Sequence, residues 1–148
     1  MNIATILDGP LRGRPVQTIG PDEPVRVAVR RMTGPPTIGS LVVCRPGQRR
    51  VIGLITERDI VRGLGQRGAG MLDTPVSNVM SSGVPLCRRD DSIRFAMAEM
   101  TRTRFRHLPV VDNGALVGLV SIGDVVKNRL QEMETETAVL RDLYIAGR

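Results

Sequence analysis

The pattern of apolar and polar positions divides the chain into two similar halves. Each half contains apolar residues at the i, i+3, i+4, i+7 spacing of an amphipathic helix. The two sets are Val25, Ala28, Val29 and Met32, and Ile93, Ala96, Met97 and Met100. Two β-rich runs follow each helix pattern: LVVC and VIGLI flank RPGQRR, and LPVV and LVGLV flank DNGA. Asp-Asn-Gly favours a tight hairpin. With a short strand in front, each half is predicted to form strand, helix, strand, turn, strand and helix.

One nine-residue phrase closes both halves: GLITERDIV at 53–61 returns as GLVSIGDVV at 118–126. A hydroxyl residue, Thr56 or Ser121, precedes an acid by three positions, Asp59 or Asp124. This spacing is typical of a capping box, in which the hydroxyl accepts from free amides at a helix N-terminus. The same N-terminus attracts anions, and a carboxylate there can accept both hydroxyls of a ribose. The pattern leaves both roles open.

The segments around these units set the expected boundaries. Short apolar segments at 3–7 and 76–80 predict one or two helical turns each, and Asp22 and Asp90 or Asp91 are predicted N-caps. The glycine-rich stretch 63–75 predicts a linker. We therefore expect a first repeat with its N-terminal segment at 1–68, a linker and second repeat at 69–130, and a C-terminal helical extension at 131–148. Each repeat is too small for a large core, so the sheets should pack together.

The C-terminal segment keeps helical spacing through Leu130, Met133, Thr137, Leu140 and Tyr144. The predicted helix, of about 25 residues, is longer than one repeat needs. Its apolar stripe beyond residue 130 should be covered by the linker of the same chain or by a second chain. We expect a homodimer in which these tails pack either near the edge of the dimer or on each other.

Composition narrows the class of protein. The aromatic residues are Phe95, Phe105 and Tyr144, so the core should be aliphatic. No apolar run approaches the roughly 18 residues of a membrane span, and the N-terminus lacks a signal-peptide pattern, which together predict a cytoplasmic protein. Cys44 and Cys87 show no metal or disulfide spacing and are expected to be reduced and mostly buried.

The net charge of +6 raises the hypothesis of nucleic-acid binding. Against it, the arginines are scattered and the aromatic side chains that stack on bases are scarce. A basic protein that binds nucleic acid, in which any clefts between the two packed sheets have only a structural role, is kept as the alternative function. No nucleophile with a base and no metal-ligand set stands out, so the chain is not expected to be an enzyme or to hold a metal.

The order of elements and the sequences GLITERD and RFRHLPVVDNGALVGLVSIGDVV resemble the tandem CBS domain, from about residue 3 to residue 128. The resemblance implies an α+β (α/β) fold of two β-α-β-β-α units packed sheet to sheet with pseudo-twofold symmetry, here with an extended C-terminal helix. Clefts between the sheets typically bind AMP, ADP, ATP, S-adenosylmethionine or NAD(H), and pairs often dimerise into a disc of four repeats. No catalytic cofactor is implied.

The resemblance also implies the residues that would bind the nucleotide. Those near the ribose and phosphates are Thr56, Arg58, Asp59, Ser121, Ile122 and Asp124. Those of the adenine pocket are Val16, Gln17, Thr18, Ile38, Gly39, Ser40, Val84, Pro85, Leu86, Leu108 and Pro109. Further phosphate candidates are Arg104, Arg106 and His107.

The function implied is a regulatory sensor in which an adenine nucleotide changes the orientation of the repeats or the interface with an unidentified partner protein. The two phrases differ, because Glu57 and Arg58 stand where the second copy has Ile122 and Gly123. The second copy also has basic residues where the first has Ile38, Gly39 and Ser40. The two sites are therefore expected to differ in affinity.

Overall fold

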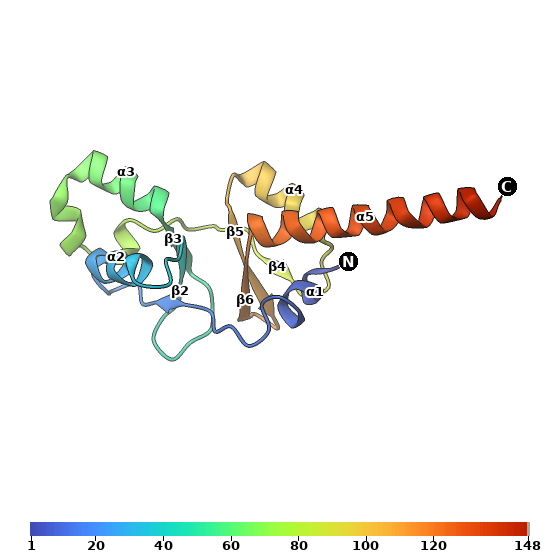
Figure 1. Ribbon diagram of the computed structural model, residues 1–148. Coiled ribbons are helices and arrows are strands. Elements are labelled where there is room, and N and C mark those ends of the chain that lie inside the picture. Colours follow the sequence, from blue (N-terminus) through green and yellow to red (C-terminus); the bar gives the residue numbers. More distant parts are fainter. Residues whose placement is uncertain (148) are drawn as a thin grey trace.

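The computed structural model describes residues 1–147 and contains two units of the same design (Figure 1). The first unit comprises β1 (Thr18–Ile19), α2 (Val25–Thr33), β2 (Ser40–Val43), β3 (Gly53–Thr56) and α3 (Glu57–Arg67). The second comprises β4 (Cys87–Arg88), α4 (Ile93–Thr103), β5 (His107–Asp112), β6 (Ala115–Ser121) and α5 (Ile122–Ala146). The element order expected for each half is confirmed. Three short helices lie outside the units: α1 (Ile3–Asp8) and the 3₁₀ helices η1 (Ala69–Asp73) and η2 (Val76–Asn78).

Both sheets have three strands and the same topology. In the order β1-β2-β3 the first pair is parallel and the second antiparallel, and β4-β5-β6 repeats this arrangement. The β5–β6 hairpin turns through Asn113 and Gly114, whose φ angles of 49° and 78° are both positive. A two-residue turn of this hand matches the twist of the strands, and asparagine and glycine tolerate it best. The Asp-Asn-Gly hairpin is confirmed.

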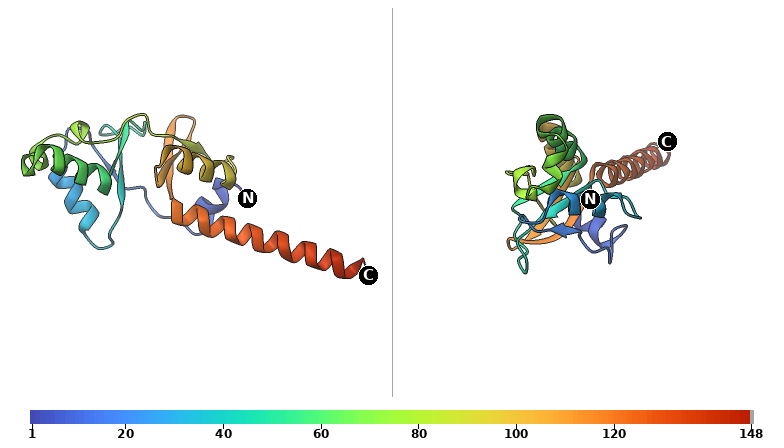
Figure 2. Two further views of the ribbon diagram at one scale, coloured as in Figure 1. Left: turned by 90° about the horizontal axis from the view of Figure 1, so that it is seen from above. Right: turned by 90° about the vertical axis from the view of Figure 1, so that its left-hand side faces the viewer.

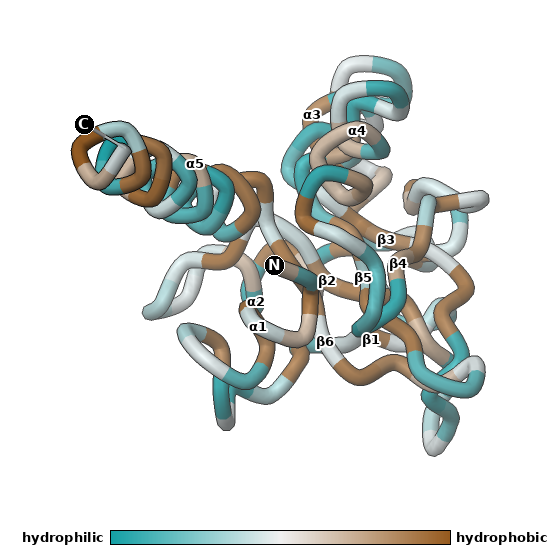
Figure 3. The backbone as a smooth tube through the Cα atoms, turned by 90° about the vertical axis from the view of Figure 1, so that its right-hand side faces the viewer, coloured by the Kyte–Doolittle hydropathy of each residue, from teal (hydrophilic) through white to brown (hydrophobic). Residues whose placement is uncertain are grey.

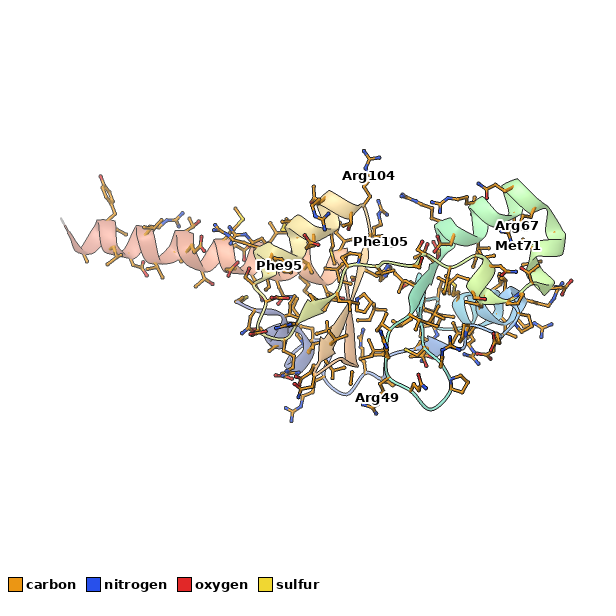
Figure 4. The ribbon with its side chains drawn as sticks, turned by 180° about the vertical axis from the view of Figure 1, so that it is seen from behind. Arg49, Arg67, Met71, Phe95, Arg104 and Phe105 are labelled. Atoms are coloured by element: carbon orange, nitrogen blue, oxygen red, sulfur yellow. The ribbon has the colours of Figure 1, made fainter. Side chains whose placement is uncertain are left out.

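Each hydrophobic core contains a segment from outside its own unit. Ile3 and Ile6 of α1 are completely buried in the second core, among Ile93, Leu108 and Val120. Met71 and Val76 are buried in the first core, and Met71 lies between α3 and α2 (Figure 4). The N-terminal segment, expected to belong to the first repeat, thus packs on the second.

Backbone hydrogen bonds hold α1 and η2 at equivalent places on the two units. The amides of Ile3 and Ala4 donate to the carbonyls of Asp91 and Arg89, just before α4. The amides of Val76 and Ser77 donate to the carbonyls of Glu23 and Pro21, just before α2. The N-caps expected from the sequence are wrong, because Ser92 caps α4 and Pro24 precedes α2 without a side-chain cap. The expected linker also begins too early, since α3 continues to Arg67.

A third cluster joins the two units sheet to sheet. Val42, Cys44, Leu54 and Leu116 are buried there, and Phe105 and Val84 pack against them. Phe105 lies between the two halves in Figure 4. Burial raises the pKa of Cys44, and it raises the pKa of Cys87 to about 12 with a contribution from Asp91. Both cysteines are free and buried thiols, as expected.

The C-terminal helix α5 leaves the body of the molecule. Its first turns pack on α4, β6 and α1, and the rest projects beyond them (Figure 2). Within residues 1–147, none of the helices is both long and apolar enough to cross a membrane.

Candidate functional site

The two repeated phrases form matching helix caps. At the start of α3, the Thr56 hydroxyl accepts from the amide of Asp59 at 3.2 Å, while the Thr56 amide and hydroxyl donate to Oδ2 of Asp59 at 2.9 and 3.0 Å. At the start of α5, Ser121 and Asp124 repeat these bonds at 3.2, 2.9 and 2.8 Å. The capping role is therefore real in both copies, and it uses only one carboxylate oxygen of each acid.

The second carboxylate oxygen of Asp59 is also engaged. The Ser81 hydroxyl donates to Oδ1 at 2.8 Å, and the Arg62 guanidinium lies 3.5 Å from the same atom. Ser81 reaches this place because its backbone forms a bridge with Leu54 of β3, with N–O distances of 2.9 and 3.0 Å. Asp59 is 3% exposed. Its carboxylate is thus largely occupied by the chain itself.

Asp124 is in a different state. Oδ1 of Asp124 receives no hydrogen bond from residues 1–147, and the residue is half-buried rather than enclosed. The chain that follows α1 lines the cleft beside Asp124 with residues 11–15. The two acids are equivalent in sequence, but Asp124 keeps one acceptor oxygen available.

The first cleft, here called the Asp59 cleft, has a volume of about 380 Å³. Its wall from the first unit includes Thr56, Glu57, Arg58 and Asp59. The second unit supplies residues 103–107, among them Arg104 and Arg106. Figure 4 shows Arg104 extending away from the end of α4. Four arginines and two acids make this cleft suited to anionic groups.

The second cleft, the Asp124 cleft, has a volume of about 460 Å³. Ser121 and Asp124 of the second unit face Val16, Gln17 and residues 38–40 of the first. The Ser40 hydroxyl is buried and has no hydrogen-bond partner within the described chain. Arg12, Arg14 and Arg89 also line the cleft, and Arg89 pairs with Asp8 at 2.5 Å. The cleft combines aliphatic walls, an unsatisfied hydroxyl and exposed guanidinium groups.

His107 and Gly39 separate the two clefts, since both residues line each of them. A Cβ atom on Gly39 would lie 3.3 Å from Cε1 of His107, so a glycine lets the imidazole approach the backbone closely. Burial lowers the pKa of His107, and Arg106 acts in the same direction, while Asp124 and Glu57 oppose the shift. The imidazole is therefore mostly neutral at neutral pH and senses charges in both clefts.

The structure brings together most of the candidate residues, but across the two units. Thr56, Arg58 and Asp59 share a cleft with Arg104, Arg106 and His107. Ser121 and Asp124 share one with Val16, Gln17, Ile38, Gly39 and Ser40. The remaining candidates lie outside both linings: Thr18, Val84, Pro85, Leu86, Leu108, Pro109 and Ile122. Leu108 is completely buried in the second core, whereas Leu86 and Ile122 are exposed.

Sequence reasoning missed several residues of the clefts. Arg62 lies one helical turn after Asp59, and this i, i+3 spacing could have identified it. Ser81, Arg12, Arg14 and Arg89 reach the clefts from loops, without a local signal in the sequence. Within residues 1–147, no group of three or more His, Cys, Asp or Glu side chains could hold a metal ion.

Comparisons with known proteins agree on one family. The sequence matches the CBS domain twice, over residues 11–66 and 76–130. It is 36% identical over 129 residues to the CBS domain-containing protein CBSX3, mitochondrial, of Arabidopsis thaliana, covering 85% of this chain and 62% of that protein. The chain thus spans about three fifths of the length of this relative.

Solved structures show the same fold. The CBS-domain containing protein ATU1752 from Agrobacterium tumefaciens superposes with a TM-score of 0.79 and 39% identity, covering 86% of this chain and 92% of that one. CBSX2, solved in complex with AMP, superposes with a TM-score of 0.67 and 22% identity, covering 82% and 92% of the two chains.

Proposed function

The chain belongs to the CBS-domain family as a tandem pair of repeats, and from this premise we propose that it is a regulatory module that binds an adenosine nucleotide in the Asp124 cleft. One observation carries the choice of cleft: Asp124 has a carboxylate oxygen without a donor in the described chain, whereas Asp59 uses both of its oxygens internally. The ribose of a nucleotide offers two adjacent hydroxyl donors to such an oxygen.

The remainder of the Asp124 cleft supports the same ligand. Val16 and Ile38 provide aliphatic contacts for adenine beside the polar Gln17, and a ligand atom can satisfy the buried Ser40 hydroxyl. The exposed Arg12 and Arg14 line the same cleft, and their guanidinium groups are suited to pair with phosphates. AMP, ADP, ATP and NAD(H) share these groups, and the AMP complex of CBSX2 supports the ligand class.

The Asp59 cleft binds the same class of ligand more weakly in this proposal. Ser81 and Arg62 must move before a ribose can reach Asp59, which costs binding energy. Because both clefts are lined by both units, a bound nucleotide alters the relative orientation of the repeats. A partner protein that contacts both units can respond to this change in the relative orientation of the repeats. The cytoplasmic location stays a prediction.

Calorimetric titration with AMP, ATP and NADH tests the site. Asp124→Asn and Asp59→Asn weaken equivalent helix caps, so each variant is the folding control for the other. We expect Asp124→Asn to weaken binding by about tenfold or more, as for a lost charge-assisted hydrogen bond, and Asp59→Asn by less than about twofold. 2′-Deoxy-AMP should bind the wild type more weakly than AMP does.

Two outcomes would contradict the proposal. In one, no adenine nucleotide binds below the millimolar range; in the other, Asp59→Asn loses affinity while Asp124→Asn does not. Absent nucleotide binding together with salt-dependent binding to DNA would favour the alternative function in nucleic-acid binding. The matches reported above name CBS-domain proteins and do not support that alternative.

A further inference from the structure

The projecting part of α5 carries an exposed apolar stripe. Every residue from 133 to 147 is exposed, including Met133 at 47% and Leu140 at 66%. Leu130, one turn nearer the body, is 55% exposed. In Figure 3, which looks toward the C-terminal end, the last turns carry hydrophobic segments and stand apart from the rest of the chain. Exposed apolar side chains in such a row favour association with another surface.

The spacing of this stripe is that of a coiled coil. Apolar and small residues alternate at intervals of four and three along α5: Val126, Leu130, Met133, Thr137, Leu140 and Tyr144. These positions correspond to d, a, d, a, d and a of a heptad. A shallow groove of about 430 Å³ follows the first part of the stripe, along Gly123, Val126 and Leu130. The face that packs on the body is a different one, marked by the buried Val125 and Asn128.

The linker of the same chain does not cover this stripe. Of the two coverings expected from the sequence, the linker is excluded, because η1 packs against α2 and α3 and its Met71 is buried in the first core. The dimer stays a prediction. The charges beside the stripe indicate whether the two helices would pair in a parallel or an antiparallel orientation.

Charged residues flank the stripe in a complementary order. In a parallel pair of helices, each g position faces the e position five residues later in the partner. Glu136 then faces Arg141 of the second copy, and Arg129 faces Glu134 of the second copy. The antiparallel register centred on residue 135 instead brings Glu134 beside Glu134 and Lys127 beside Arg141. Only opposite charges meet in the parallel pair.

The part of α5 next to the body is held by ion pairs within the chain. Arg129 pairs with Glu132 at 2.7 Å, and the N-terminal amine donates to Glu132 at 2.8 Å. These contacts fix the direction in which α5 leaves the body, and they leave Arg129 only 14% exposed. Glu136 also lies 3.7 Å from the Arg129 guanidinium, but its side chain is 58% exposed and Arg141 is exposed as well. The Glu136–Arg141 pair can therefore form between two copies and contributes more than the Arg129–Glu134 pair to the choice of partner.

We propose that residues 126–144 of α5 pair with the same segment of a second copy of this chain as a parallel two-stranded coiled coil. The two tails then lie side by side along a common axis. Both CBS pairs are at the same end of the coiled coil, the N-terminal end of the paired helices. This interface is independent of the nucleotide clefts, because residues beyond 124 line neither of them.

Analytical ultracentrifugation of the full chain without nucleotide tests the apolar stripe. The wild type should be a dimer, and Leu140→Asp should raise its dissociation constant by about tenfold or more, because a charge enters the pairing face. Val139→Asp is the matched control, since Val139 is 52% exposed and lies off the stripe. It should change the constant by less than about twofold. Circular dichroism verifies that both variants stay folded.

A charge exchange tests the parallel arrangement. Glu136→Arg and Arg141→Glu should each weaken the dimer, because each variant places like charges opposite one another. An equimolar mixture of the two variants should recover a heterodimer of wild-type stability, since both cross-pairs are again opposite in charge. A monomeric wild type, equal effects of Leu140→Asp and Val139→Asp, or a mixture no tighter than the single variants would overturn the proposal.

Discussion

At the scale of residues, Asp59 and Asp124 show how equal motifs acquire unequal chemistry. Both acids close a capping box with nearly the same distances. Ser81 then satisfies the outer oxygen of Asp59, while Asp124 faces an open cleft. A buried carboxylate that is already hydrogen-bonded is a poor acceptor for a ligand, because an existing bond must break first. The hydroxyl of Ser81, which lies far from Asp59 in sequence, therefore makes the two sites chemically different.

His107 gives a prediction at the same scale. Because burial lowers its pKa below the ordinary value of about 6.5, the unfolded chain takes up this proton at higher pH than the folded chain does. Above about pH 6.5 the imidazole is mostly neutral in both the folded and the unfolded chain, so its lowered pKa does not reduce the free energy of unfolding there. As the pH falls below that value toward the lowered pKa, the free energy of unfolding should decrease.

Two measurements check the prediction on His107. NMR titration reads the pKa directly, since this is the single histidine of the chain. Denaturant unfolding across the pH range should show that His107→Gln loses less stability than the wild type below about pH 6.5. A titration midpoint above 6.5 would mean that Asp124 and Glu57 outweigh the effect of burial.

At the scale of elements, local patterns predicted most of what is observed. The helices α2 and α4, the hairpin with Asn113 and Gly114, and both capping boxes depend on residues only a few positions apart. The predicted N-caps Asp22, Asp90 and Asp91 were wrong. Asp91 instead accepts from the amide of Arg88 through its side chain, while Ser92 caps α4. Several polar residues competed for one cap, and the path of the loop decided between them.

The helix α1 allows a prediction on an element. Ile6 is completely buried in the second core although it lies at the start of the chain. Ile6→Ala should lower the free energy of unfolding by about 2–5 kcal/mol, since it removes buried methyl groups and leaves a cavity. Thr5→Ala, at an exposed position on the same helix, should cost less than about 1 kcal/mol. Denaturant unfolding measures both, and equal effects would show that α1 is not part of the core.

At the scale of the whole molecule, each unit completes the other. The first core requires Met71 and Val76, and the second requires Ile3 and Ile6. The clefts likewise take one wall from each unit. The pair is thus the smallest arrangement that completes both the cores and the clefts.

A comparison of two fragments tests this statement. Residues 1–68 end before Met71 and Val76 and should show no cooperative thermal unfolding, because the first core is then incomplete. Residues 12–81 retain the whole first core and should unfold more cooperatively, although they expose the face that packs on the second sheet. If residues 1–68 unfolded as cooperatively as residues 12–81, the first core would not require Met71 and Val76.

By itself, the sequence determined the duplicated unit, the hairpin, the two caps and the long last helix, because each of these depends on contacts between near neighbours along the chain. Only the tertiary structure decided which segments complete which core, that Val16 and Gln17 lie opposite Asp124, and that Ser81 reaches Asp59. These contacts join residues far apart in sequence, and the loop paths that bring them together follow from packing of the whole chain rather than from any local pattern.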